Sequence, residues 1–188
     1  MQAPSATSWS PRLLRGYRDR SSNHDKGEKV KNKCVLITGA TKGIGWAISQ
    51  QLADQGAHVV GLARNVQDID FPGYLYACDL SNAGQTEEVL RVIREKYPVD
   101  AIVNNAGVVK PEPLGEIDLQ SLYEVYDLNV RAAVQVTQAF VAAMKARQSG
   151  RIVNICSRVV HWAYDRTSYS AAKRALLGCT RSWALELA

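Results

Sequence analysis

The stretch "CVLITGATKGIG", residues 34–45, decides the fold class, because it joins an apolar run to a glycine-rich turn and the start of a helix. The run 34–37 has the length and composition of a buried strand. After it, Ile44, Ile48 and Leu52 recur at helical spacing. Glycine permits a tight turn and lets backbone amides approach a phosphate at the positive end of the following helix. We therefore expect a strand, loop and helix that together bind a dinucleotide.

Short apolar runs alternate with longer helical patterns through the rest of the chain. Further strands are expected over 57–63, 74–78, 100–105 and 151–156. Helices are expected over 43–55, 83–96, 119–146 with a possible break, and 168 to the end. The strands are continuously apolar rather than alternating, as in a parallel sheet that is covered on both faces. We therefore predict an α/β fold of the Rossmann type, with a doubly wound parallel sheet and helices on both faces.

The composition is that of a globular protein, with 188 residues of which 46% are hydrophobic and 22% charged. The sequence has neither an apolar run of about 18 residues nor a signal-peptide core, so it indicates neither membrane insertion nor secretion, and we expect a cytoplasmic protein. The cysteines lack C-x-x-C spacing, which argues against a metal site or a disulfide framework. They are expected to be reduced and mostly buried, and they are Cys34, Cys78, Cys156 and Cys179.

The positive charge lies at the N-terminus. Residues 1–33 hold eight Lys or Arg and three Asp or Glu, a net charge of +5, and the remaining chain sums to zero. We therefore predict a basic, disordered leader over 1–33, followed by the dinucleotide-binding Rossmann domain over 34–188. A nucleic-acid-binding domain surface is not indicated, although a cationic arm could touch an acidic partner. The first eighteen residues contain arginine and no acid, so an organelle transit peptide remains the alternative to a cytoplasmic location.

Two cations indicate the choice of nucleotide. An NAD-binding unit places Asp or Glu about 20 residues after its glycines, where the acid binds the ribose hydroxyls. This sequence instead has Ala63 and Arg64 at the end of the second strand. Arg64 could fork onto a 2′-phosphate, and Lys42 in the glycine loop could add a second charge. Taken separately, each cation reads equally as a solvated surface residue, but together they favour NADP(H).

Polar segments follow the later strands, at 104–107 ("NNAG") and 154–157 ("NICS"). Ligands of open α/β sheets bind outside the carboxyl ends of the strands, where these segments and the glycine loop converge. Further along, Tyr169 and Lys173 are four residues apart, so they share one face of a helix. Alone, such a pair is most often a solvated surface pair. The combination of these segments, rather than any one of them, is what indicates a functional site.

Taken in order, the motifs are Thr38-Gly39-x-x-x-Gly43-x-Gly45, Asn104-Asn105-Ala106-Gly107, Asn129, Ser157 and Tyr169-x-x-x-Lys173. With them, residues 34–188 resemble the short-chain dehydrogenase/reductase family, and most closely its branch of 3-oxoacyl-carrier-protein-reductase-like enzymes. The resemblance implies an NADP(H)-dependent oxidoreductase that interconverts a small-molecule carbonyl and a secondary alcohol.

The resemblance also implies a role for each catalytic candidate. Tyr169 would exchange a proton with the substrate oxygen, and Lys173 would support it and bind the nicotinamide ribose. A phenol has a pKa of about 10, and an ammonium group nearby favours its ionised form. Ser157 would donate a hydrogen bond to the substrate oxygen. Asn129 would hold a water that links Lys173 to solvent.

The cofactor-binding residues that the resemblance implies lie in the glycine loop, at the ends of the next strands and on the tyrosine helix. They are Thr38, Gly39, Thr41, Lys42, Gly43, Ile44, Gly45, Arg64, Asp79, Leu80, Asn105, Ala106, Gly107, Tyr169 and Lys173. The sequence departs from the family pattern at Cys156, where serine is frequent, and it lacks the family's last strands and substrate loop. Since the chain stops at Ala188 within a helical pattern, the alternative is a catalytically idle NADP-binding or interaction protein.

The segment 157–167 connects the serine to the tyrosine helix and should contribute to substrate selection. Its candidates are Arg158, His161, Trp162, Tyr164 and Arg166, each of which could equally face solvent or a subunit contact. The stretch 129–144 is apolar on more than one face, so it must bury against more than its own sheet. In relatives this helix and the tyrosine helix pack across a subunit interface. We therefore predict a homodimer or homotetramer.

Overall fold

The computed structural model describes residues 30–188. The predictions of a disordered leader and of a transit peptide fall mainly on residues 1–29, which lie outside the described residues. Among the helices of residues 30–188, none is long and apolar enough to cross a membrane.

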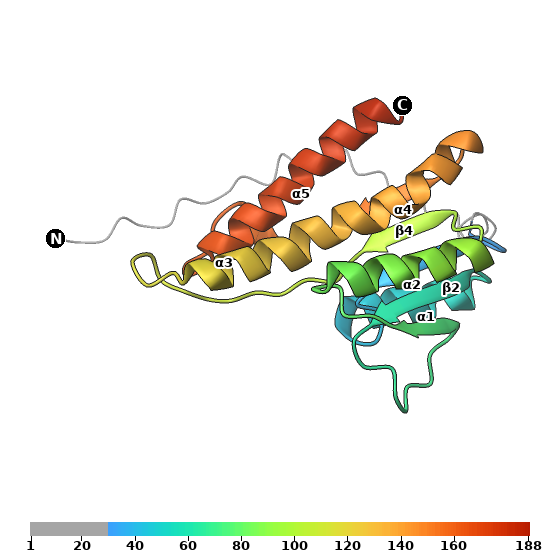
Figure 1. The fold of residues 1–188 in the computed structure, drawn as a ribbon, viewed down its shortest axis with the longest axis horizontal. Coiled ribbons are helices and arrows are strands. Elements are labelled where there is room, and N and C mark those ends of the chain that lie inside the picture. The colour runs from blue at the N-terminus through green and yellow to red at the C-terminus, as the bar shows by residue number, and fades with distance from the viewer. Residues whose placement is uncertain (1–29) are drawn as a thin grey trace, which may run out of the picture.

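The core of the fold is a five-stranded sheet in the order β3-β2-β1-β4-β5, of which Figure 1 labels β2 and β4. The strands are β1 (Cys34–Thr38), β2 (His58–Ala63), β3 (Tyr74–Ala77), β4 (Ala101–Asn104) and β5 (Arg151–Asn154). Every neighbouring pair is parallel. The chain first adds strands on one side of β1 and then crosses to β4 on the other. Parallel sheets of this order place their ligands at that reversal, outside the carboxyl ends of the strands.

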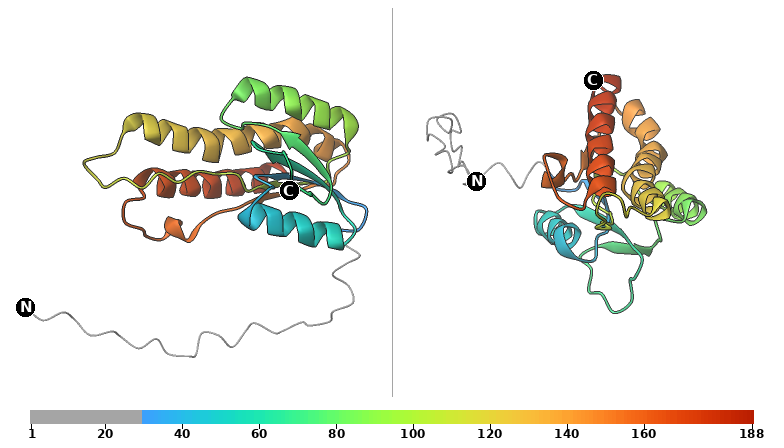
Figure 2. Two further views of the ribbon diagram at one scale, coloured as in Figure 1. Left: turned by 90° about the horizontal axis from the view of Figure 1, so that it is seen from below. Right: turned by 90° about the vertical axis from the view of Figure 1, so that its left-hand side faces the viewer.

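Helices cover both faces of the sheet, as predicted. They are α1 (Gly43–Asp54), α2 (Ala83–Lys96), α3 (Leu119–Tyr126), α4 (Ala132–Ala146) and α5 (Thr167–Glu186). Figure 2 shows α1 on one face of the sheet and α2 with α4 on the other. The break expected within 119–146 is a π-helical turn, η2 (Asp127–Arg131), and a short 3-10 turn, η3 (Arg158–Val160), precedes α5.

The continuously apolar strands supply two cores at once, because successive side chains of a strand point to opposite faces. On one face, Leu36 packs in a cluster with Leu90 of α2 and Phe140 of α4. On the other face, Val35 and Ile37 pack with residues of α1. The prediction of a parallel sheet buried on both faces is therefore confirmed, and with it the Rossmann-type fold class.

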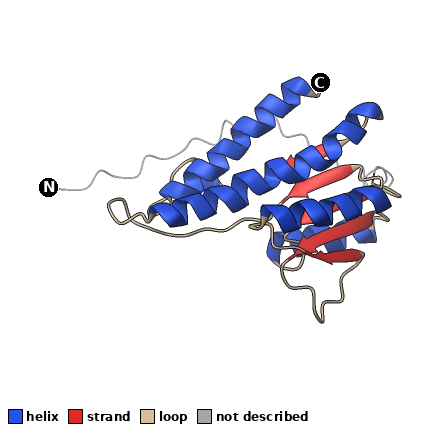
Figure 3. Ribbon diagram, in the orientation of Figure 1, coloured by secondary structure: helices blue, strands red, loops and turns tan. Residues whose placement is uncertain are grey.

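The long helix α5 packs beside α3 and η2 and then passes the edge strand β5 (Figure 3). This course brings the first turns of α5 to the carboxyl end of the sheet. The cysteines are all free thiols, and Cys34 and Cys78 are buried. Cys156 and Cys179 are only partly buried, so the expectation of mostly buried thiols holds for Cys34 and Cys78 alone.

Candidate functional site

The predicted site residues come together at the carboxyl ends of the strands, where the order in which the chain adds strands reverses. The glycine loop follows β1, the "NNAG" turn follows β4, and Ser157 follows β5. Tyr169 and Lys173 are contributed by the first turns of α5, and Asn129 by the π-helical turn. The site is therefore assembled from elements that are up to 135 positions apart in the sequence, counted from Thr38 to Lys173.

The glycine loop leaves its backbone open to a ligand. Gly39 and Gly43 have φ values of +65° and +56°, in the left-handed region that favours glycine. A Cβ on Gly43 would meet nothing within 4 Å, whereas one on Gly45 would lie 2.2 Å from the carbonyl oxygen of Gly39. Gly45 thus lets α1 start against the loop. Gly43 borders open space.

The amino end of α1 has no side-chain cap. Its N-cap residue is Lys42, whose side chain accepts no hydrogen bond from the helix. By contrast, Asn82 caps α2 and Asp118 caps α3 through their side-chain oxygens. Because the first N–H groups of a helix need acceptors and carry partial positive charge, the open end of α1 fits a phosphate group. The loop and helix end therefore fit a dinucleotide.

Thr38 and Asn105 lock the glycine loop to the "NNAG" turn. The Thr38 hydroxyl oxygen accepts hydrogen bonds from the backbone N–H groups of Asn105 and Ala106, each at 2.9 Å. The Asn105 amide donates to the carbonyl oxygens of Thr38 at 2.9 Å and Gly39 at 3.2 Å. Thr38 and Asn105 thus fix the backbone of the two turns that follow the neighbouring strands β1 and β4.

The two cations expected to select the nucleotide, Lys42 and Arg64, are exposed. Arg64 directly follows β2, and its charge helps to lower the pKa of Asp79. The main cause of that lowering is Ser81, which donates to the Asp79 carboxylate from its hydroxyl at 2.7 Å and its N–H at 3.0 Å. Leu80 is buried. The Asp79 carboxylate is therefore already engaged within its own turn.

Arg131 ties the Leu80 turn to the π-helical turn, a link that sequence reasoning missed. Its guanidinium donates to the carbonyl oxygen of Leu80 at 2.6 Å and to Gln135 at 2.7 Å. It also makes a fork-like pair with Asp127. The spacing of Asp127 and Arg131, four residues on a helix, was the available signal.

Lys173 is buried, with 2% of its surface exposed, and lies beside Tyr169. Its Nζ is 5.6 Å from the centroid of the Tyr169 ring and donates to the carbonyl oxygen of Ile155 at 2.9 Å. Burial lowers the pKa of Lys173, and this effect outweighs the charge interaction with Cys156, which acts in the opposite direction. The positive charge is therefore held close to the phenol by a backbone carbonyl.

Asn129 is 1% exposed and, like Lys173, lies close to Gly107. Its amide nitrogen donates to the carbonyl oxygens of Val108 and Val125, both at 2.8 Å. Its Oδ1 is buried and has no hydrogen-bond partner within the described chain. A Cβ on Gly107 would lie 2.4 Å from that oxygen and 3.5 Å from the Lys173 Nζ. Glycine at 107 therefore allows the asparagine and the lysine to approach each other.

Ser157 is partly buried and begins the 3-10 turn η3. Its Oγ accepts a hydrogen bond from the N–H of Val159 at 3.3 Å. It stands two residues after Ile155, whose carbonyl oxygen binds Lys173. The serine and the lysine are therefore held by one short segment after β5.

The residues expected to select a substrate mostly face solvent. Trp162 and Tyr164 are 83% and 95% exposed, and Arg158 and His161 are also exposed. Arg166 is partly buried and pairs with Glu112 through the backbone in an isolated parallel β-bridge, in which the Glu112 N–H donates to the Asp165 carbonyl oxygen at 3.0 Å. The loop that carries these side chains is thereby joined to the segment after β4.

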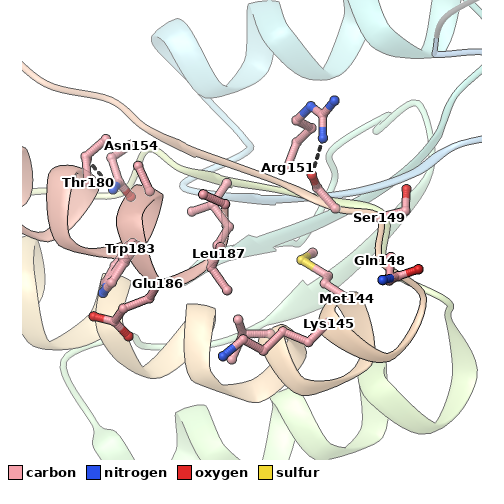
Figure 4. Close-up of a pocket in the computed structure, with 15 residues that line it drawn as sticks. Met144, Lys145, Gln148, Ser149, Arg151, Asn154, Thr180, Trp183, Glu186 and Leu187 are labelled. Carbon is pink, nitrogen blue, oxygen red and sulfur yellow. Dashed lines mark hydrogen bonds between the residues drawn. The ribbon is translucent and has the colours of Figure 1, made fainter.

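A cavity of about 580 Å³ lies at the opposite end of β5, between the C-terminal ends of α4 and α5 (Figure 4). Met144, Arg151 and Trp183 are among its lining residues, and no predicted site residue borders it. Within residues 30–188, no group of three or more His, Cys, Asp or Glu side chains could hold a metal ion.

Comparison with known proteins places these features in one family. The family model described as short chain dehydrogenase matches residues 33–188. A 3-oxoacyl-[acyl-carrier-protein] reductase of Thermotoga maritima is 31% identical over 172 residues, covering 85% of this chain and 70% of its own. An L-xylulose reductase of Mesocricetus auratus is 38% identical over 161 residues, covering 81% and 65% respectively.

Solved structures agree with the sequence relatives. A Beutenbergia cavernae protein, described as an NAD(P) dependent gluconate 5-dehydrogenase with bound NADP at low occupancy, superposes with a TM-score of 0.79 at 32% identity. The match covers 84% of this chain and 67% of that one. A short-chain dehydrogenase from Streptomyces avermitilis also gives a TM-score of 0.79, at 28% identity, covering 84% of this chain and 61% of its own.

Proposed function

The chain belongs to the short-chain dehydrogenase family, and from that premise we propose that it is an NADP(H)-dependent oxidoreductase that interconverts a carbonyl and a secondary alcohol. The observation that carries the proposal is the buried Lys173 ammonium, 5.6 Å from the Tyr169 ring centroid. A buried lysine loses hydration, and its charge acts strongly on neighbours in such a place. This arrangement suits proton transfer by the phenol.

When bound, the dinucleotide supplies or accepts the hydride. During reduction Tyr169 donates its phenolic proton to the carbonyl oxygen, so that the carbonyl carbon gains hydride and the oxygen gains a proton. The Lys173 charge stabilises the phenolate left behind. In the oxidative direction the same phenolate accepts the alcohol proton.

Ser157 and Asn129 support that transfer in different ways. Ser157 donates its hydroxyl hydrogen to the substrate oxygen, where negative charge develops. Asn129 presents its unpartnered Oδ1 beside Gly107 and Lys173. That acceptor is suited to hold a water molecule through which Lys173 exchanges protons with solvent.

The proposed cofactor site runs along the glycine loop and the carboxyl ends of the neighbouring strands. The open amino end of α1 and the Gly39 to Gly45 loop take the pyrophosphate. Arg64 and Lys42, both exposed, take the 2′-phosphate, for which the guanidinium offers a forked pair of donors. The NADP described in the Beutenbergia cavernae structure supports this choice by analogy.

The oligomer predicted from the sequence is also part of the proposal. Leu119 and Tyr123 of α3 are each 64% exposed, and Leu177 of α5, the helix packed beside it, is 37% exposed. A second copy would cover such a face. We expect a homodimer or homotetramer by light scattering, and a monomer would contradict the prediction.

The test of the proposed activity is the Tyr169→Phe variant, which removes only the phenolic oxygen. NADPH oxidation is followed with acetoacetyl coenzyme A and L-xylulose, chosen from the relatives' activities. We expect turnover by the wild type and a loss of about a thousandfold in the variant, as for removal of a general acid. The control is Tyr74→Phe, since Tyr74 is exposed on β3.

Two results would contradict the proposal. Undiminished turnover in Tyr169→Phe would show that another group moves the proton. Binding of NADPH by the wild type without turnover of any probe would favour the idle nucleotide-binding protein instead.

A further inference from the structure

Ser170, the residue after Tyr169, hydrogen-bonds to the segment that carries Ser157. Its hydroxyl donates to the carbonyl oxygen of Val159 at 3.0 Å, and the N–H of Val159 donates to the Ser157 Oγ at 3.3 Å. We propose that Ser170 is a positioning residue that sets the orientation of the Ser157 hydroxyl through Val159. The inference rests on the proposed function, in which Ser157 binds the substrate oxygen.

The direction of the Ser170 bond is unusual for a helical hydroxyl. Serine and threonine within helices commonly donate to the carbonyl four residues back in the same helix. Ser49, Thr86 and Thr180 do so here, at 2.8, 2.8 and 2.7 Å. Ser170 instead gives its single hydrogen to another element of the fold. The bond therefore connects two parts of the site.

Val159 is held at three points. Its side chain is buried, with 8% exposed, its N–H binds Ser157 and its carbonyl oxygen accepts from Ser170. A residue fixed at its side chain and at both backbone groups has little freedom to rotate. The donor that faces the Ser157 oxygen is therefore fixed relative to α5.

This fixed donor decides where the Ser157 hydrogen can point. A hydroxyl has one hydrogen and two lone pairs, and the Val159 N–H occupies one lone pair. The hydroxyl hydrogen is then directed away from that N–H, which leaves it free to donate to the substrate oxygen. If Val159 moves, Ser157 loses this bias and its hydroxyl samples other rotamers.

The Ser170 bond adds to two contacts that join residues 155 and 156, just before Ser157, to α5. Lys173 donates to the Ile155 carbonyl at 2.9 Å, and the Cys156 thiol lies 3.7 Å from the Lys173 carbonyl oxygen. These two bonds hold the chain before Ser157, and the Ser170 bond holds it after Ser157. Together they set the position of Ser157 relative to Tyr169.

The first test compares Ser170→Ala with Ser170→Thr in the full chain. The alanine variant should lower kcat about tenfold, because misplacing a catalytic group is costly, while the NADPH Kd changes less than about twofold. Threonine keeps the hydroxyl and should restore most of the lost kcat. Ser182→Ala, whose hydroxyl bonds to Glu186 near the end of the same helix, is the matched control.

The second test asks whether Ser170 acts through Ser157. In a double-mutant cycle, Ser170→Ala should cause almost no further loss once Ser157 is alanine, because the hydroxyl that it orients is gone. An unchanged kcat in the single Ser170→Ala variant would overturn the proposal. So would an equal, roughly tenfold loss in both backgrounds, since it would show independent action.

Hydrogen exchange at the Val159 amide tests the anchor without turnover. Ser170→Ala should speed exchange of that amide about tenfold, as expected when a local restraint is lost, and Ser182→Ala should not. Unchanged protection in Ser170→Ala would overturn the proposal even if activity fell. If the wild type turns over none of the probes, the proposed function fails and the positioning role fails with it. If the wild type turns over a probe and Ser170→Ala does so at the same rate, the positioning role alone fails and the proposed function stands.

Discussion

The two halves of the candidate site differ in the groups that they offer, which are mainly backbone groups and exposed cations in one and buried polar side chains in the other. The proposed nucleotide half, residues 34–80, offers backbone groups of a glycine loop, an uncapped helix end and exposed cations. The proposed catalytic half, residues 101–173, combines two almost fully buried polar side chains, Asn129 and Lys173 at 1% and 2% exposed, with the partly buried Ser157 and Tyr169. Each buried group is held by carbonyl oxygens from other elements.

The difference separates recognition from chemistry. An exposed cation can be replaced at little cost to the stability of the fold. Substitutions in the nucleotide half should therefore change which dinucleotide it prefers without unfolding the protein. A buried charge or amide is costly to leave unpaired, so the catalytic half ties its chemistry to its packing. Changes in the two halves should therefore have distinct signatures.

Lys173→Met should have the largest effect on activity. It removes the charge beside Tyr169, and we expect kcat/KM to fall by about a thousandfold, within the range for acid–base groups. Initial rates of NADPH oxidation measure the loss. The exposed Lys145→Met is the control, and a fall of less than about tenfold would contradict the role of Lys173.

Gly45→Ala should destabilise the nucleotide half through a steric clash. The added Cβ would lie 2.2 Å from the Gly39 carbonyl oxygen, so α1 must shift, and we expect a loss of about 3 kcal/mol in unfolding free energy. The control is Gly178→Ala in α5, where a Cβ meets nothing within 4 Å. There alanine should stabilise by about 0.5–1 kcal/mol. Urea denaturation measures both, and equal effects would contradict the account.

Arg131→Leu should affect both halves, because its guanidinium connects the Leu80 carbonyl with Asp127 of the π-helical turn. Loss of these charge-assisted bonds should cost about 2 kcal/mol of stability. The matched control is Arg91→Leu, whose exposed pair with Glu95 contributes about 0.5 kcal/mol or less. If urea unfolding shows the two variants to be equally stable, Arg131 does not join the halves.

Arg64→Leu should change only recognition. Without the guanidinium the NADPH Kd should rise about tenfold, the loss expected for one charge-assisted bond, while the NADH Kd and the stability stay unchanged. Fluorescence titration using Trp46, which follows the glycine loop, gives both constants. Arg94→Leu on α2 is the control. Equal weakening of both nucleotides would remove the proposed contact with the 2′-phosphate.

The fold was readable from the sequence because its signals are local. Continuous apolar strands, helical spacing and glycines after the first strand each act over a few residues. The π-helical turn was expected only as a possible break. Asn129 within this turn donates to the carbonyl oxygen of Val108, 21 positions away, and no local pattern encodes that contact.

The site was readable in part for the same reason. The spacing of Tyr169 and Lys173 on one helix face is a local property, and the structure places them beside each other on α5, as that spacing predicts. Their catalytic roles stay predictions. The contacts of Ser170 with Val159 and of Arg131 with Leu80 span 11 and 51 positions. They depend on how helices pack on the sheet, so only the three-dimensional arrangement revealed them.

The most direct test of the central claim is deuterium transfer from NADPH that carries deuterium at both positions of the reactive carbon of its nicotinamide ring. The wild-type chain is incubated with acetoacetyl coenzyme A or L-xylulose, and the alcohol product is analysed by mass spectrometry. The account predicts one deuterium on the former carbonyl carbon, and its near absence with Tyr169→Phe. Alcohol without deuterium, or no alcohol from any probe despite tight NADPH binding, would contradict it.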